Sequence, residues 1–253
     1  MLFDTHAHLD DERFDKDRDS VIAQLREEGI SLLVNVGSDM ESSRTSVALA
    51  QEYDFIYAAV GVHPDETGEL SEIDMNTLAE LSKQNKVVAI GEIGLDYHNN
   101  GAPKEVQQQW FKRQLIMAKE LSMPYIIHDR DAHGDTLAIL KEIGYFNGVM
   151  HCFSGSAEMA KEVVNLGMMV SFAGPVTFKN APKTKEAARA VPTERLMVET
   201  DSPYLSPEPH RGKRNDSSRV RFVVEEIARL HEMEFEELAR ITTENGKRFF
   251  GIV

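Results

Sequence analysis

The chain contains eight short apolar runs, rich in β-branched residues, that are separated by longer stretches with helical spacing. The runs lie at residues 2–3, 32–36, 56–60, 87–90, 125–127, 149–150, 168–170 and 196–198. Near-continuous apolar strands are typical of a parallel sheet that is covered on both faces, and crossover helices connect parallel strands. Eight such units in 253 residues predict a (β/α)8 TIM barrel.

The main alternative is an open doubly wound sheet. Such a sheet usually has a glycine-rich phosphate-binding turn after its first strand, whereas residues 5–11 read THAHLDD and contain no glycine. We see no internal repeat, no low-complexity tract and no linker, so we expect residues 1–253 to form a single domain.

Composition limits the function classes. There are 28 Lys and Arg residues against 42 Asp and Glu residues, which gives a formal net charge of -14. This charge argues against a protein that coats nucleic acid through its global charge. A local basic patch or bound metal ions remain possible. The first 20 residues carry no secretory signal, and no apolar run approaches the ~20 residues that a membrane helix needs, so we expect a cytoplasmic protein.

Metal-competent side chains follow six of the eight predicted strands. In chain order they are His6 and His8, His63, Glu92, His128, His151 and Asp201. In a barrel the catalytic groups lie at the carboxyl ends of the strands, and residues two apart in a strand point to the same side. Imidazole and carboxylate ligands together suit a divalent ion such as Zn²⁺, Mn²⁺ or Mg²⁺, so a metal site is predicted at these ends.

Two other nucleophile chemistries are disfavoured. Cys152 is the single cysteine and follows His151 directly, so strand parity turns it away from the site and predicts a buried small hydrophobe. The chain also lacks the G-x-S-x-G turn that would present a nucleophilic serine.

These residues belong to motifs that resemble those of the TatD family of metal-dependent hydrolases. The motifs are DTHAHLD (4–10), GVHP (61–64), GEIGLDY (91–97), IIHDRDA (126–132), HCFSG (151–155), ETDSPYL (199–205) and RGKRN (211–215). The resemblance covers nearly the whole chain in order. It departs at Asp216 and Ser217, where the family often has an acidic or polar residue and then proline.

The resemblance implies a centre with two divalent ions, Mg, Mn or Zn. The implied ligands are His6, His8 and Asp201 for one ion, His128 and His151 for the other, and Glu92 as a bridge between both.

The activity that the resemblance implies is a deoxyribonuclease that hydrolyses phosphodiester bonds at DNA ends or in oligonucleotides, in the manner of a 3′-5′ exonuclease. Asp201 would orient or deprotonate the attacking water, and His63 would contact a phosphate oxygen or protonate the leaving group. Arg211, Lys213 and Arg214 are the expected substrate-binding residues.

Two alternatives remain open. The same metal site suits an acyl or amide hydrolase, such as a D-aminoacyl-tRNA deacylase, because metal ligands report the nucleophile and not the leaving group. A non-catalytic binding module would be expected to lack some ligands, and all six are present. Two amphipathic helices, predicted at 219–230 and 235–250, are explained by packing on the barrel as well as by oligomer contacts, and we expect a monomer.

Overall fold

The structure is a computed structural model that describes residues 1–253. Its strands are β1 (Leu2–Ala7), β2 (Ile30–Val36), β3 (Ile56–Val60), β4 (Val87–Asp96), β5 (Tyr125–Arg130), β6 (Gly148–Met150), β7 (Met169–Phe172) and β8 (Leu196–Val198). Its α-helices are α1 (Arg18–Glu27), α2 (Met40–Glu52), α3 (Glu72–Leu81), α4 (Lys104–Glu120), α5 (His133–Ile143), α6 (Ala157–Asn165), α7 (Pro182–Ala190), α8 (Val220–Leu230) and α9 (Phe235–Phe250). The strands form one sheet in the order β1 to β8, with at least one helix after each strand, which is the (β/α)8 barrel that the sequence predicts.

Contacts divide the chain into two compact units. The first comprises residues 1–35 and 152–253, and the second comprises residues 36–151. The organisation of residues 1–253 as a single domain stays a prediction. No helix in the structure is both long enough and apolar enough to span a membrane.

In the first unit the two ends of the sheet meet. Ala7 of β1 forms a parallel bridge with Ser202, just beyond β8, and Thr5 Oγ1 donates a hydrogen bond to Val198 O at 2.9 Å. The backbone N–H of Asp201 donates to His6 O at 2.9 Å. Contact between the first and last strands closes a barrel, and here it places the loop after β8 beside the end of β1.

Helix α9 packs against β1 at very short range. A Cβ atom at Gly246 would lie 2.7 Å from Phe3 Cδ1 and 3.2 Å from Thr5 Cγ2, closer than packed carbon atoms approach. Glycine is therefore required there for the helix to lie this close to the strand.

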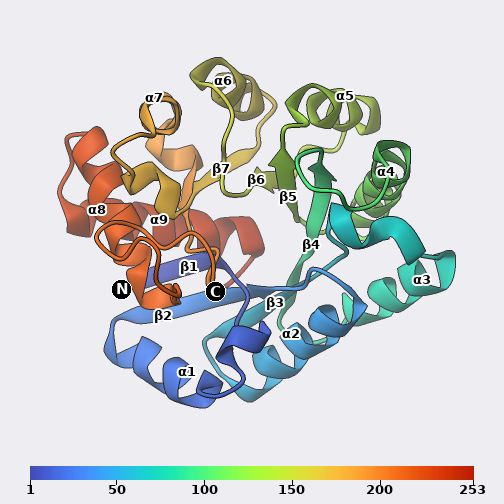
Figure 1. Ribbon diagram of the computed structural model, residues 1–253, viewed down its shortest axis with the longest axis horizontal. Coiled ribbons are helices and arrows are strands. Elements are labelled where there is room, and N and C mark those ends of the chain that lie inside the picture. The colour runs from blue at the N-terminus through green and yellow to red at the C-terminus, as the bar shows by residue number, and fades with distance from the viewer. The chain divides into compact units, whose positions relative to one another are not determined.

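In the second unit, β3 to β6 run side by side, with β4 paired in parallel to β3 and to β5, and β5 to β6. Figure 1 shows α2 to α5 along the outer side of these strands. Two buried glutamines of α4 hold the ends of β3 and β4. Gln114 exchanges two hydrogen bonds with the backbone of Val62, at 2.9 and 3.0 Å, and Gln107 does the same with Asp96, at 2.9 Å each.

The sequence predicts the eight strands but places four of their ends too early. β7 continues to Phe172 rather than to residue 170. β1, β4 and β5 continue to Ala7, Asp96 and Arg130, so His6, Glu92 and His128 lie inside strands rather than after them. The ladder continues because backbone pairing does not require apolar side chains. A register shift between Ile90 and Ile93 also interrupts the regular alternation on which the predicted orientation of Glu92 depended.

Candidate metal centre

The first unit brings together three of the predicted ligands, His6, His8 and Asp201. The two Nε2 atoms lie 3.1 Å apart, and they lie 3.7 Å (His6) and 3.4 Å (His8) from Asp201 Oδ1. One ion can contact three donor atoms at once only if the radius of the circle through those atoms does not exceed the metal–ligand bond length. Here its radius is about 2 Å, within the ~2.0–2.2 Å of zinc bonds to nitrogen and oxygen. The two imidazoles and the carboxylate therefore fit one divalent ion.

A buried carboxylate below this cluster ties β1 to the segment after β8. Asp4 accepts hydrogen bonds from the backbone N–H of Thr200 at 2.9 Å and from its hydroxyl at 2.5 Å. Burial raises the pKa of Asp4 to about 7, although the hydrogen bonds from Thr200 act in the opposite direction. Thr200 is the residue before Asp201, and Asp4 lies two residues before His6. The contact between Asp4 and Thr200 therefore fixes the separation of His6 and Asp201.

The second unit brings together Glu92, His128 and His151. Glu92 Oε1 lies 2.8 Å from His128 Nδ1 and 2.7 Å from His151 Nε2, and the two imidazole nitrogens are 3.4 Å apart. The circle through these atoms has a radius of about 1.8 Å, which again lies within reach of metal–ligand bonds. Glu92 is 3% exposed, and a buried carboxylate between two imidazoles is typical of a metal site.

The remaining nitrogen of His128 is held by a second carboxylate. His128 Nε2 lies 3.0 Å from Asp96 Oδ2, and the other oxygen of Asp96 accepts the backbone N–H groups of His98 and Asn99, each at 2.9 Å. Burial lowers the pKa of His128, but its bonds with Asp96 and Glu92 outweigh this and raise the pKa to about 9. Burial of Asp96 is likewise outweighed by the bonds from His128, Asn99 and His98, which leave the pKa of that carboxyl well below its usual range.

This arrangement has a chemical consequence. An imidazole that donates one N–H to a carboxylate presents its other nitrogen as a lone pair, with a fixed ring orientation. Asp96 therefore fits the role of the partner that directs His128 Nδ1 towards Glu92 and His151.

His63 lies beside the second cluster. Its ring is 4.3 Å from the ring of His128, and its Nδ1 accepts the backbone N–H of Asp65 at 3.2 Å. Burial, and then the charge of His128, lower the pKa of His63 to about 3. Because Nδ1 is the acceptor, the proton of this neutral ring is on Nε2, which is a hydrogen-bond donor.

Three of the predicted substrate-binding residues, all of them basic, lie on the loop between β8 and α8, in different surroundings. The guanidinium of Arg211 lies 4.1 Å from the centre of the Phe178 ring, and Lys213 is exposed. Arg214 forms a two-point ion pair with Asp17, at 2.7 and 2.8 Å. Its charge is therefore compensated within the protein, unlike the free charge that the sequence suggests.

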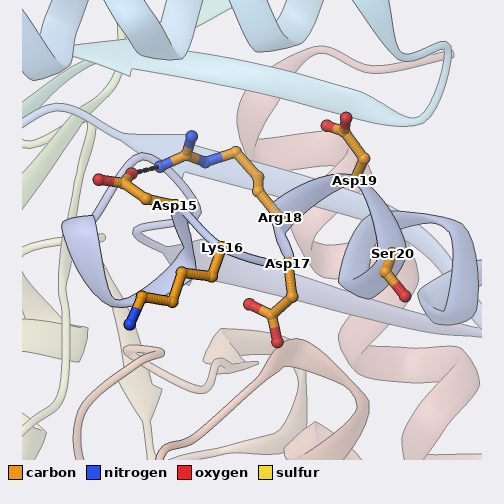
Figure 2. Close-up of a pocket in the computed structure, with 6 residues that line it drawn as sticks. All are labelled: Asp15, Lys16, Asp17, Arg18, Asp19 and Ser20. Carbon is orange, nitrogen blue, oxygen red and sulfur yellow. Dashed lines mark hydrogen bonds and ion pairs between the residues drawn. The ribbon is translucent and has the colours of Figure 1, made fainter.

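Asp17 also lines a surface hollow formed by residues 15–20, where α1 begins. Figure 2 shows this hollow, with Arg18 paired to Asp15 at 2.6 Å. It contains none of the predicted metal or substrate residues.

Sequence reasoning missed three buried carboxylates. Asp4 and Glu199 each lie two residues before a predicted ligand, and Asp96 lies four residues after Glu92. Alternation along a strand is the signal that could have found Asp4, which lies two residues before His6 in β1. The prediction for Cys152 was wrong, because this residue is only half-buried. It adopts a φ of 41° in a turn after β6, where its N–H donates to Glu199 Oε1 at 2.7 Å.

The fold is a (β/α)8 barrel and its two donor clusters suit divalent ions, and comparison with known proteins gives the class and the family. The family model described as TatD related DNase matches residues 3–251. The uncharacterized metal-dependent hydrolase YabD of Bacillus subtilis (strain 168) is 51% identical over the whole of both chains. The chain belongs to the TatD family of metal-dependent hydrolases.

Two further comparisons agree. The crystal structure of YJJV, a TatD homologue from Escherichia coli K12, has a TM-score of 0.94 and 29% identity, and the match covers 100% of this chain and 98% of that one. A protein of Citrobacter koseri named 3′-5′ ssDNA/RNA exonuclease TatD is 32% identical, and the match covers 99% of each chain.

Proposed function

We propose that this protein is a deoxyribonuclease that removes nucleotides from the 3′ end of single-stranded DNA. The observation that carries the proposal is that each unit gathers three of the ligands the family pattern requires into one buried or half-buried cluster. The name of the C. koseri relative supplies the substrate class and the polarity.

Two divalent ions, Mg, Mn or Zn, complete the proposed centre. We assign His6, His8 and Asp201 to one ion and His128 and His151 to the other. The assignment of Glu92 as a bridging ligand comes from the family resemblance. Ions bound there would lower the pKa of a water molecule and offset the negative charge of a phosphodiester.

The protein's own residues position the reacting groups. Asp201 orients the attacking water and accepts its proton. His63 donates a hydrogen bond from Nε2 to a phosphate oxygen, and this role suits it better than protonation of the leaving group because its Nδ1 already accepts from Asp65. Arg211 and Lys213 contact the phosphates of the substrate strand. Arg214 contributes indirectly. Its guanidinium is paired with Asp17, and this ion pair stabilises the loop that carries Arg211 and Lys213.

We further propose that residues 1–253 form a single domain and that the protein is a cytoplasmic monomer.

The proposal is tested with a short single-stranded DNA labelled at its 5′ end. The wild-type protein with Mg²⁺ or Mn²⁺ is expected to shorten it stepwise, and a copy with phosphorothioate at the 3′-terminal linkages is expected to resist. Glu92→Gln should lose this activity, whereas Glu41→Gln, an exposed position on α2, should retain it. If the pure wild type leaves DNA intact but hydrolyses aminoacyl-tRNA esters, the nuclease proposal is wrong and the acyl hydrolase alternative takes its place.

A further inference from the structure

An exposed aromatic side chain stands beside the first ligand cluster. Tyr204 is 41% exposed, and its ring centre lies 6.2 Å from that of His8, at an interplanar angle of 75°. Its backbone N–H donates to Asp201 O at 2.9 Å, so one turn separates the ring from a predicted metal ligand. None of the roles assigned above uses this residue.

Tyr204 is held rigidly although it is exposed. Its hydroxyl donates to Asp11 Oδ2 at 2.7 Å, and its backbone carbonyl accepts from the buried side chain of Asn215 at 2.8 Å. The guanidinium of Arg13 lies 4.4 Å from the ring centre. In turn, Arg214 Nη1 donates to Arg13 O at 2.7 Å. Contacts from two separate loops thus fix an aromatic ring that has Arg13 over it, while the residue is still 41% exposed.

Rigid exposed aromatic rings of this kind suit planar ligands. Nucleic-acid bases stack on aromatic side chains and on guanidinium planes, and stacking tolerates any base because each has a π face. A ring that is already fixed loses little conformational entropy when a base stacks on it. The arginine beside the ring adds a cation that suits the polyanionic backbone of the same ligand.

We propose that Tyr204, supported by Arg13 and Asp11, is a stacking platform for a nucleobase that flanks the cleaved phosphodiester. This inference rests on the proposed nuclease function and adds to it a binding site for the base. It also gives the predicted residue Arg214 a specific task, because Arg214 joins Asp17 to the backbone of Arg13 and so steadies the platform.

The test measures binding of a fluorescent single-stranded oligonucleotide with hydrolysis-resistant terminal linkages to the metal-loaded protein. Tyr204→Ala is expected to weaken binding by about 5- to 150-fold, the range that corresponds to the stacking energy of one base. Tyr204→Phe keeps the ring and loses only the hydroxyl bond to Asp11, so its affinity should stay within about twofold of wild type. Ile73→Ala, an exposed position on α3, serves as the background control.

A second oligonucleotide series separates stacking from a purely structural role. It carries an abasic nucleotide at the last or the second-last position. At one of these two positions wild type and Tyr204→Ala should bind equally, because the base that stacks is gone. If Tyr204→Ala loses as much affinity for both abasic oligonucleotides as for the normal one, or loses none at all, the platform is refuted.

The failure of the nuclease proposal gives a different result. If wild type neither binds the hydrolysis-resistant oligonucleotide nor shortens unmodified DNA, the proposed function fails and the platform fails with it. If wild type shortens DNA while Tyr204→Ala binds it as well as wild type does, only the platform is refuted.

Discussion

Asp96 is expected to control metal binding by His128, and the substitution Asp96→Asn tests this. The asparagine keeps the shape of the side chain, and its oxygen can still accept the N–H groups of His98 and Asn99. Its amide nitrogen then faces His128 Nε2, now 3.0 Å from Asp96 Oδ2. An amide nitrogen only donates, so Nε2 must become the acceptor and the proton must move to Nδ1. The proton on Nδ1 then blocks the lone pair that faces Glu92, and a metal ion would need that lone pair.

The size of the effect follows from the type of contact. A hydrogen bond to a charged group contributes about 1.5–3 kcal/mol, and carboxylates that orient metal-ligating histidines change metal affinity by ~10–100-fold. We therefore expect Asp96→Asn to weaken the second metal by about 10- to 100-fold. Competition with a chromophoric chelator measures this affinity. ¹⁵N NMR of the histidine side chains reports the tautomer of His128 in the metal-free protein at a pH above 9, where this ring, with its pKa of about 9, is neutral.

Asp131→Asn is the matched control. Asp131 Oδ2 lies 3.0 Å from His98 Nδ1, the same separation as in the Asp96 pair, but its side chain is 67% exposed and it contacts no predicted ligand. Its φ of 55° is one that asparagine tolerates. Metal affinity should be unchanged in this variant. If Asp96→Asn binds metal within twofold of wild type, or if His128 keeps its tautomer, the reasoning about Asp96 is wrong.

Three further predictions concern stability. Gly246→Ala should lower the free energy of unfolding by about 1–3 kcal/mol through overpacking. Gly134→Ala in α5, where no atom lies within 4 Å of a new Cβ, should raise the free energy of unfolding slightly. Urea denaturation compares the two variants. Arg229 lowers the pKa of Glu226, so the ion pair stabilises the fold above about pH 4.3 and this stabilisation is lost as pH falls through the lowered pKa. Glu226→Gln should therefore be less stable than wild type by under about 1 kcal/mol at pH 7, and the gap should close in acid, with Glu225→Gln as the exposed control. Calorimetry of residues 1–253 should show one transition, and two separate transitions would contradict the single-domain prediction.

The strands were predictable from the sequence because each is a local run of apolar residues. β3 and β8 have the predicted bounds, and helix α9 also matches. The ligand residues were predictable because barrel strands end on one side, where histidines and carboxylates are conspicuous. The extension of β4 through Asp96 was not, since polar residues give no hydrophobic period.

Contacts between distant residues were beyond the sequence pattern. Asp96 meets His128 across 32 positions, and Arg214 meets Asp17 across 197. From its charge alone, Arg214 was predicted to be a free cation that binds the substrate. Only the fold reveals its partner, Asp17. The half-buried state of Cys152 depends in the same way on a left-handed turn that strand parity does not anticipate.

Each of the two donor clusters is expected to hold one divalent ion. The decisive measurement is the metal content per chain, determined by mass spectrometry after dialysis of the metal-loaded protein. We predict two ions in wild type, one in His6→Gln and one in His151→Gln, with two retained in His231→Gln, whose imidazole instead contacts Ala188 O at 2.9 Å. Two ions in all four proteins, or none in wild type, would contradict the account.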